Sequence, residues 1–326
     1  MENPNPELLK LNGSKMLKSP KHPGVLVIVG PTAVGKTEIS LRLAEALDGE
    51  IVSMDSRLIY RGMDIGTAKP SQSEMARLPH HMIDIAEPDE VWSLALFRRE
   101  VLLEIDAIRA RGHTALLVGG TGQYVRALME GWEIPSQKPD YAMRAVLEEW
   151  GNEIGSPELH RKLSLVDPEA GESIEPSNLR RVVRALEVIF KSGRKFSIQQ
   201  TRNPPNLNFW IIGLDRPREE LYRRVDERIE AMFDCGLVDE VKTLLARGYG
   251  PQNPSLSAIG YREVVQYLQG EINREEAEIL MRRKTRMFIR RQANWFKKTD
   301  EQIHWYAMTP DPLEQILTDL RIANVV

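Results

Sequence analysis

The chain has 326 residues, with 44 basic side chains against 47 acidic ones and one cysteine. That length suits about two domains, and a lone cysteine excludes an intramolecular disulfide and a zinc site built from clustered cysteines. The net charge of -3 argues against nucleic-acid binding over the whole surface but leaves room for a local basic site. Because no apolar run is long enough to cross a membrane and no secretory leader is recognisable, we expect a cytoplasmic protein.

The first third of the chain alternates short apolar runs with helical patterns. Residues 1–22 carry prolines and lysines without a periodic pattern, and we expect a mobile tail there. Apolar runs bounded by glycines are typical of strands buried on both faces of a parallel sheet, so the alternation predicts βαβ units. The predicted strands are 25–29, 50–54 and 115–118, and the predicted helices are 36–47 and about 93–110.

The middle of the chain has a different pattern. From about 132 to 206 the sequence predicts amphipathic helices and no convincing strand, with several prolines dividing it into short pieces. We interpret this stretch as a helical insertion. A strand-like run at 208–213 resumes the α/β pattern, and the remainder is predicted to be helical. The predicted core therefore combines residues 23–131 and 207–326, with 132–206 inserted between them.

A phosphate-binding loop lies between the first strand and the first helix. Residues 30–37 match G-x-x-x-x-G-K-[ST] at every fixed position, in the strand–loop–helix context that this motif requires. Its backbone N–H groups and the helix N-terminus favour phosphate, Lys36 adds a point charge, and the Thr37 hydroxyl can ligate Mg²⁺. A glycine-rich turn without a ligand is the weaker alternative. The predicted phosphate-binding residues are Gly30, Pro31, Thr32, Ala33, Val34, Gly35, Lys36 and Thr37.

This motif predicts an α/β fold with a P-loop NTPase-like parallel sheet, and by itself it favours an ATP-binding kinase or NTPase. However, the third strand ends in Val118-Gly-Gly, where an NTPase usually has an aspartate that binds the metal. The first carboxylate at a strand end is instead Asp55, which we expect to face the ligand crevice at the carboxyl edge of the sheet. The alternative role for Asp55 is an N-cap of the next segment.

Seven further segments, in order along the chain, resemble the signature of the tRNA dimethylallyltransferase family. With its one cysteine the chain is similar to the bacterial type, not to members that carry a zinc finger. The resemblance implies Mg²⁺-dependent transfer of a dimethylallyl group from dimethylallyl diphosphate to N6 of the adenosine adjacent to the anticodon in tRNA, with release of diphosphate. The matching segments are 55–70, 80–84, 118–124, 184–188, 236–241, 258–262 and 285–296.

The resemblance also implies roles for individual residues. The phosphate loop holds the leaving diphosphate, not a transferring phosphoryl group, which accounts for the missing NTPase aspartate. Asp55 is the implied general base that takes a proton from N6, and Thr37 the implied contact to both metal and diphosphate. Arg228 is the implied diphosphate clamp, since an arginine fork suits two phosphate oxygens. The alternative is that Arg224 and Arg228, one turn apart on a solvated helix, pair only with acidic residues.

A basic segment near the C-terminus is the candidate contact with RNA. The window 282–298 contains eight basic residues and no acidic one. On a helix they span an arc of about 200°, while apolar residues fill most of the remainder and should pack on the core. This pattern is expected for binding a phosphate backbone, and a solvated basic helix without a ligand is the alternative. The basic residues are Arg282, Arg283, Lys284, Arg286, Arg290, Arg291, Lys297 and Lys298, and the apolar ones are Met281, Phe288, Ile289, Trp295 and Phe296.

A base in an anticodon loop must be extruded to reach a buried diphosphate. The resemblance therefore implies that tRNA and donor enter from two sides and that the helical insertion grips the anticodon stem-loop. Nothing in the sequence requires more than a monomer. His80 and His81 lack further ligands at metal spacing, and we expect a structural role. The implied tRNA-binding residues are Asp55, Ser56, Arg57, Leu58, Thr121, Arg144, Arg180, Arg181, Val182, Val183, Arg184, Ser257, Ala258, Ile259, Gly260, Tyr261, Arg262, Arg290, Arg291, Gln292, Ala293, Asn294, Trp295, Phe296 and Lys297.

Three other functions stay open at this point. A prenyltransferase acting on free adenine nucleotide shares the loop and the aspartate but has no need of the basic helix. A small-molecule P-loop kinase turns over ATP, and the missing metal-binding aspartate speaks against it. A nucleotide-dependent RNA-binding module without chemistry predicts that Asp55→Ala leaves every activity unchanged.

Overall fold

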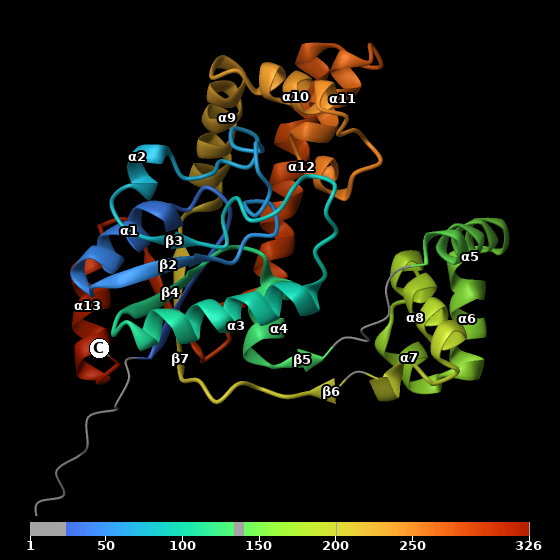
Figure 1. The fold of residues 1–326 in the computed structure, drawn as a ribbon, viewed down its shortest axis with the longest axis horizontal. Helices are drawn as coiled ribbons and strands as arrows, with labels where there is room; N and C mark the ends of the chain where they lie inside the picture. Colours follow the sequence, from blue (N-terminus) through green and yellow to red (C-terminus); the bar gives the residue numbers. More distant parts are fainter. Residues whose placement is uncertain (1–23, 134–139, 200, 326) are drawn as a thin grey trace, which may run out of the picture.

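A parallel β-sheet forms the centre of the computed structural model, which describes residues 24–133, 140–199 and 201–325 (Figure 1). The tail expected at 1–22 lies outside these residues. Within them the sheet has six strands in the order β3-β2-β4-β1-β7-β8, and every neighbouring pair is parallel, as predicted. The strands are β1 (Val25–Val29), β2 (Gly49–Ser53), β3 (His80–His81), β4 (Thr114–Val118), β7 (Phe209–Asp215) and β8 (Ile303–Ala307).

The first strand, β1, is apolar because both of its faces are covered. All five of its residues are buried, and it pairs with β4 on one side and β7 on the other. Its carboxyl end leads directly into residues 30–35 and then into the first helix. The phosphate loop therefore lies at an interior position on the carboxyl edge of the sheet, where parallel α/β folds bind ligands.

Helices pack on this sheet through apolar residues at helical spacing. In the helix over 94–110, Phe97, Val101, Ile105 and Ile108 recur every three or four residues, and each is at most 1% exposed. The strands and helices predicted in the first third of the chain are confirmed to within one or two residues. The helices of this part are α1 (Lys36–Ala46), α2 (Gln72–Met75), α3 (Leu94–Ala110) and α4 (Gly122–Met129), with α13 (Leu313–Ile322) added from the C-terminus.

Two predictions about strands are wrong. The C-terminal part is not all helical, because β8 extends the sheet beyond β7. β8 lies at the edge of the sheet, with a hydrogen-bonded neighbour strand on one side only, and it is less buried than a central strand. It carries His304 and Trp305 where a central strand has aliphatic residues, so its sequence does not form a clear apolar run. The stretch 132–206 also contains a strand pair, β5 (Trp132–Glu133) with β6 (Thr201–Arg202), in which two residues per strand are too few to show a period.

The helical unit between β5 and β6 has a hydrophobic core of its own, separate from the core around the sheet. Its residues include Leu159, Leu163, Val182 and Leu186. Pro157 and Pro168 do not interrupt helices here, because each lies in the first turn of one, where proline is tolerated. Figure 1 shows this unit set apart from the sheet. Its elements are α5 (Tyr141–Ile154), α6 (Ser156–Val166), α7 (Pro168–Ser173), α8 (Leu179–Ser192) and η1 (Ser197–Gln199).

A second group of helices follows β7 and is gathered beyond the sheet in Figure 1. The long helix of this group packs against its first helix and returns to α4, which brings its C-terminal half beside the phosphate loop. Among the described residues, each helix is too short or too polar to cross a lipid bilayer. The elements are α9 (Arg218–Asp234), α10 (Leu237–Ala246), η2 (Pro254–Ser257), α11 (Tyr261–Leu268) and α12 (Arg274–Trp295).

Candidate functional site

The phosphate loop is shaped by glycine and by its own lysine. Gly30 has φ +149°, and a Cβ there would lie 2.7 Å from the carbonyl oxygen of Leu214, so only glycine fits. Lys36 Nζ donates to the carbonyl oxygens of Gly30 at 3.0 Å and Pro31 at 2.9 Å. Burial lowers the pKa of Lys36 to about 8, although the negative charge of Asp55 opposes that lowering. The pKa of Lys36 thus lies much closer to physiological pH than that of an exposed lysine, although the ammonium form still predominates at neutral pH.

A cavity of about 340 Å³ lies beside this loop. The loop and the carboxyl ends of β2 and β4 contribute polar groups to it, and the helices α9 and α12 contribute mostly apolar side chains. Three groups that are distant in sequence, namely Thr32, Asp55 and Arg228, thus line one space. The lining residues are Thr32, Asp55, Ser56, Arg57, Gly66, Thr67, Ala68, Thr121, Val225, Arg228, Ile229, Met232, Ser257, Ala258, Ile259, Met281, Thr285 and Phe288.

Asp55 combines the two roles that the sequence left open. Its Oδ1 accepts a hydrogen bond from the backbone N–H of Arg57 at 2.8 Å, so it caps the turn that follows β2. The same carboxyl group lines the cavity. Burial raises the pKa of Asp55, and the bond from Arg57 and the charge of Lys36 only partly offset this effect. A carboxylate with a raised pKa next to a ligand cavity is suited to accept a proton.

In the described part of the chain, Arg224 and Arg228 of α9 do not pair with acids, contrary to the alternative considered for them. Arg224 Nε donates to the carbonyl oxygen of Ala33 at 2.8 Å and so supports the phosphate loop from outside. Arg228 lines the cavity and, among the described residues, makes no ion pair. Burial, and secondarily the charge of Arg224, lowers the pKa of Arg228. A half-buried cation without a counterion at a phosphate loop is suited to bind an anion.

The basic window of α12 is less free than its sequence indicates. Four of its cations are ion-paired with acids from other elements, which a sequence window cannot reveal. Among the described residues, exposed basic side chains without an ion pair remain at four positions of this window. The paired ones are Arg282 with Asp226, Glu230 and Glu278, Lys284 with Glu263, Arg286 with Asp226, and Lys298 with Asp215, and the exposed ones are Arg283, Arg290, Arg291 and Lys297.

The apolar face expected for α12 is only partly a core face. Met281, Ile289 and Phe296 are buried as expected, whereas Phe288 is 36% and Trp295 is 37% exposed. Phe288 lines the cavity, so its exposed area faces a ligand site. Exposed aromatic rings beside exposed cations are a common feature of surfaces that bind single-stranded nucleic acid.

Several side chains expected to contact tRNA are instead buried in packing contacts. Gln292 is 3% exposed; its Oε1 accepts from Thr32 N at 2.9 Å and its Nε2 donates to Gly120 O at 3.0 Å. It therefore joins the phosphate loop to the segment after β4 and cannot also reach RNA. The other buried members of the predicted set are Val182, Val183, Ala258, Gly260, Tyr261 and Phe296.

The remaining members of that set stay accessible. In the helical unit Arg180 and Arg181 are exposed, while Arg144 and Arg184 are half-buried. Arg57 donates to Pro254 O at 2.8 Å and to Ser257 Oγ at 3.2 Å, which links the end of β2 to η2. The other accessible or half-buried members are Ser56, Leu58, Thr121, Ile259, Arg262, Arg290, Arg291, Ala293, Asn294, Trp295 and Lys297.

A buried glutamate that the sequence analysis missed orients two of these arginines. Glu187 is 0% exposed and bonds to Arg144 Nε at 2.8 Å, to Arg184 Nη1 at 2.7 Å and to Asp140 N at 2.7 Å. Burial alone raises the pKa of Glu187, but these three bonds outweigh it and leave the pKa lowered. A glutamate on the apolar face of a predicted helix could have indicated this role, because a buried acid needs partners for its charge.

The adjacent histidines hold strands together. His81 Nε2 lies 2.6 Å from Glu50 and its Nδ1 lies 3.0 Å from Glu104, which connects β3 to β2 and α3. His80 Nδ1 lies 2.9 Å from the carbonyl oxygen of Leu78. These contacts agree with the structural role that we expect for the two histidines.

Comparison with known proteins places these features in a family. The sequence model described as IPP transferase matches residues 58–299, and one described as isopentenyl transferase matches residues 23–86. A tRNA dimethylallyltransferase of Herpetosiphon aurantiacus is 45% identical over 294 residues, which cover 90% of this chain and 93% of that protein. One from Chloroflexus aggregans is 49% identical over 287 residues, covering 88% and 97%.

Solved structures agree with this comparison. The tRNA isopentenylpyrophosphate transferase of Bacillus halodurans is 40% identical, with a TM-score of 0.68 and coverage of 93% of this chain and 96% of that one. A eukaryotic dimethylallyltransferase acting on tRNA is 26% identical, with a TM-score of 0.75 and coverage of 92% of this chain and 78% of that one. The parallel sheet and its phosphate loop are thus those of a P-loop NTPase-like α/β core.

Proposed function

The chain belongs to the IPP transferase family of tRNA dimethylallyltransferases, and from that premise we propose which reaction its own residues perform. The reaction is transfer of a dimethylallyl group from dimethylallyl diphosphate to N6 of the adenosine adjacent to the anticodon in tRNA. The observation that carries the proposal is the convergence of the phosphate loop, Asp55 and Arg228 on one partly apolar cavity.

The donor is held by its diphosphate. Backbone N–H groups of 30–37, the Lys36 ammonium and the Arg228 guanidinium supply positive charge where negative charge accumulates as the allylic C–O bond breaks. The apolar residues of α9 and α12 suit the dimethylallyl group, because it has no polar atom to satisfy. They are Val225, Ile229, Met232, Met281 and Phe288.

The acceptor amine needs a base. N6 forms a bond to the allylic carbon, the carbon–oxygen bond breaks, diphosphate leaves with that electron pair, and N6 becomes cationic. Asp55, with its raised pKa, takes the proton. Asp55→Asn keeps the shape and the turn but cannot accept this proton.

Mg²⁺ fits the donor set of the loop. No group of three or more metal-ligating side chains occurs among the described residues. Mg²⁺ commonly takes only one or two protein ligands beside substrate phosphates and water, and Thr37 provides a hydroxyl at the start of α1. When bound, the ion neutralises charge on the departing diphosphate.

The proposed tRNA surface combines exposed cations of two regions. On α12 these are Arg290 and Arg291, with Lys297 just beyond its end, and in the helical unit 140–199 they are Arg180 and Arg181. Glu187 holds Arg144 and Arg184 beside the latter two. We propose that this unit grips the anticodon stem-loop, and that the protein works in the cytoplasm as a monomer.

The test separates this function from its rivals. The protein is incubated with Mg²⁺, labelled dimethylallyl diphosphate and unmodified tRNA, beside reactions containing AMP or ATP alone. Label in tRNA, absent with Asp55→Asn, is the expected result. Label only in AMP indicates a free-nucleotide prenyltransferase, and ATP turnover without transfer indicates a kinase.

A further inference from the structure

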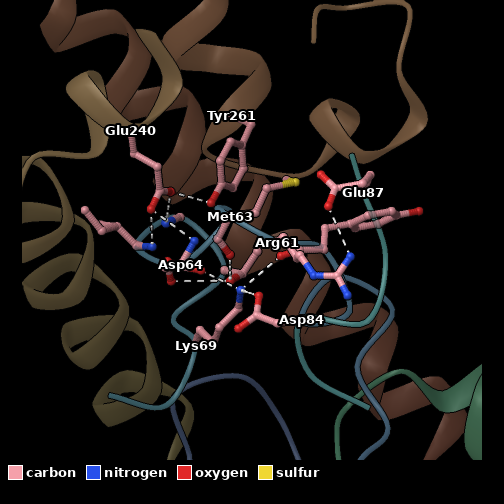
Figure 2. Close-up of polar contacts among 12 residues, drawn as sticks. Arg61, Met63, Asp64, Lys69, Asp84, Glu87, Glu240 and Tyr261 are labelled. Carbon is pink, nitrogen blue, oxygen red and sulfur yellow. Dashed lines mark hydrogen bonds and ion pairs between the residues drawn. The ribbon is translucent and has the colours of Figure 1, made fainter. Parts of the chain in front are cut away.

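Three consecutive backbone N–H groups of an irregular segment beside the cavity point at one carboxylate on a helix distant in the sequence. Glu240, on α10, accepts through Oε2 from Asp64 N at 3.0 Å and Ile65 N at 2.8 Å (Figure 2). Its Oε1 accepts from Gly66 N at 3.3 Å. Successive N–H groups arranged in this way form an anion-binding concavity, and here the anion is a side chain of the same protein.

The neighbouring tyrosine strengthens this contact. The Tyr261 hydroxyl donates to Glu240 Oε1, and its ring is 0% exposed. Burial, followed by the charge of Glu240, raises the pKa of Tyr261, so the hydroxyl remains a donor. A Cβ on Gly66 would lie 2.5 Å from the Tyr261 ring, so the ring and the carboxylate together fix this glycine.

Lys69 secures the other end of the segment. Its side chain is 3% exposed, and Nζ donates to Tyr60 O at 2.9 Å and pairs with the carboxylates of Asp64 and Asp84 (Figure 2). Residues 61–69 form no helix or strand, so these polar contacts set the shape of the segment. Three of its members, Gly66, Thr67 and Ala68, line the cavity, whereas Glu240 does not.

We propose that Glu240 is a positioning residue for the transfer reaction, acting through the wall formed by 66–68. The kinetic part of this inference rests on the proposed function. Without the carboxylate, three N–H groups lose their shared acceptor and the wall can shift by the small distances that misplace a reacting group. The sheet, the phosphate loop and Asp55 should stay in place, because the hydrogen bonds of Glu240 go to residues 64–66 and Tyr261.

The test compares Glu240→Gln with Asp239→Asn in the full chain. Asp239 is the adjacent exposed acid on α10 and, within the part of the chain that the structure describes, pairs only with Lys242 at 3.0 Å, so it matches the change in charge without touching the loop. In Glu240→Gln we expect the amides of 64–66 to exchange hydrogen about tenfold faster, and kcat/KM for tRNA to fall about tenfold. Glu240→Asp should recover part of both effects, and Asp239→Asn should match the wild type.

Two results overturn the proposal. One is identical exchange and kinetics in Glu240→Gln and Asp239→Asn. The other is a kinetic loss that equals the loss of folded protein while the 64–66 amides keep wild-type exchange. If Glu240→Gln does not fold, Tyr261→Phe serves instead, since it removes the hydroxyl and keeps the ring against Gly66, and it should show smaller changes of the same sign. Should the wild type transfer no prenyl group, the proposed function fails, and amide exchange still decides whether Glu240 holds the loop.

Discussion

Asp55 lines the cavity, Lys36 lies close enough for its charge to act on Asp55, and their pKa values are displaced toward each other. The pKa of Asp55 is raised from 3.8, and that of Lys36 is lowered to about 8. The reaction needs Asp55 without its proton and Lys36 with it. Activity is therefore lost as pH falls through the raised pKa of Asp55, and again as pH rises through about 8.

We expect a bell-shaped pH profile of kcat/KM for the diphosphate donor, which reports groups of the free enzyme. In Lys36→Arg the basic limb near pH 8 should disappear, because a guanidinium stays charged across this range. A basic limb that persists unchanged in Lys36→Arg would assign it to another group.

Glu187 stabilises the helical unit and takes no part in the transfer reaction. Its pKa in the folded state lies below the ordinary 4.5, so its stabilising contribution is complete above that pH and is lost as pH falls through the folded value. Glu187→Gln should destabilise the helical unit by about 3 kcal/mol and flatten this acid dependence. Hydrogen exchange in α8 measures the effect, and Glu158→Gln, an exposed acid on α6, is the control. Equal protection in both variants would contradict the buried role.

The elements differ in how well their sequence predicted them. β1, β2, β4 and β7 are covered on both faces, so their apolar runs are clear, and their predicted positions are confirmed. β8 lies at the edge of the sheet, and because it contains polar and aromatic residues, its sequence did not predict a strand. Apart from Glu278, one turn before Arg282, the ion-pair partners of the basic residues at 282–298 come from α9, α11 and β7, which are distant in the sequence.

The residues of the candidate site also differ in how well the sequence predicts them. The phosphate loop and Asp55 follow from local motifs next to strands, and these are visible in the sequence. The contribution of 66–68 depends on how an irregular segment packs against α10 and α11, and Gln292 depends on the path of α12. Such contacts join residues far apart in the chain, so local patterns carry no signal for them.

Helix α12 allows a matched test of RNA contact. Arg290 is exposed, whereas Arg286, one turn earlier, pairs with Asp226. We expect Arg290→Ala to weaken tRNA binding and to reduce the slope of log affinity against log salt by about one. Arg286→Ala should leave that slope unchanged while lowering thermal stability slightly. Equal slopes in wild type and Arg290→Ala would remove Arg290 from the interface.

At the scale of the molecule, the helical unit leaves and re-enters the core at adjacent points. Trp132 pairs with Arg202 and Glu133 with Thr201, so the two ends already lie side by side. Replacing residues 134–200 by an Asn-Gly turn should therefore preserve the sheet and donor binding. Affinity for tRNA should fall about tenfold or more, because the arginines of this unit are lost. Binding assays with labelled donor and with tRNA measure both, and undiminished tRNA affinity would contradict a gripping role.

The order of the strands also has a consequence for synthesis on the ribosome. β1 ends at Val29, but its neighbour β7 begins only at Phe209, which is 209 − 29 = 180 residues later. At ~5–20 residues per second, one edge of an apolar strand waits about 10–40 s for its partner. The helical unit emerges within that interval and has its own core, so it can fold first. The nascent chain should thus need chaperone protection most while its insertion is being made, and a ribosome halted soon after that unit has emerged should carry a finished helical unit beside an unfinished sheet.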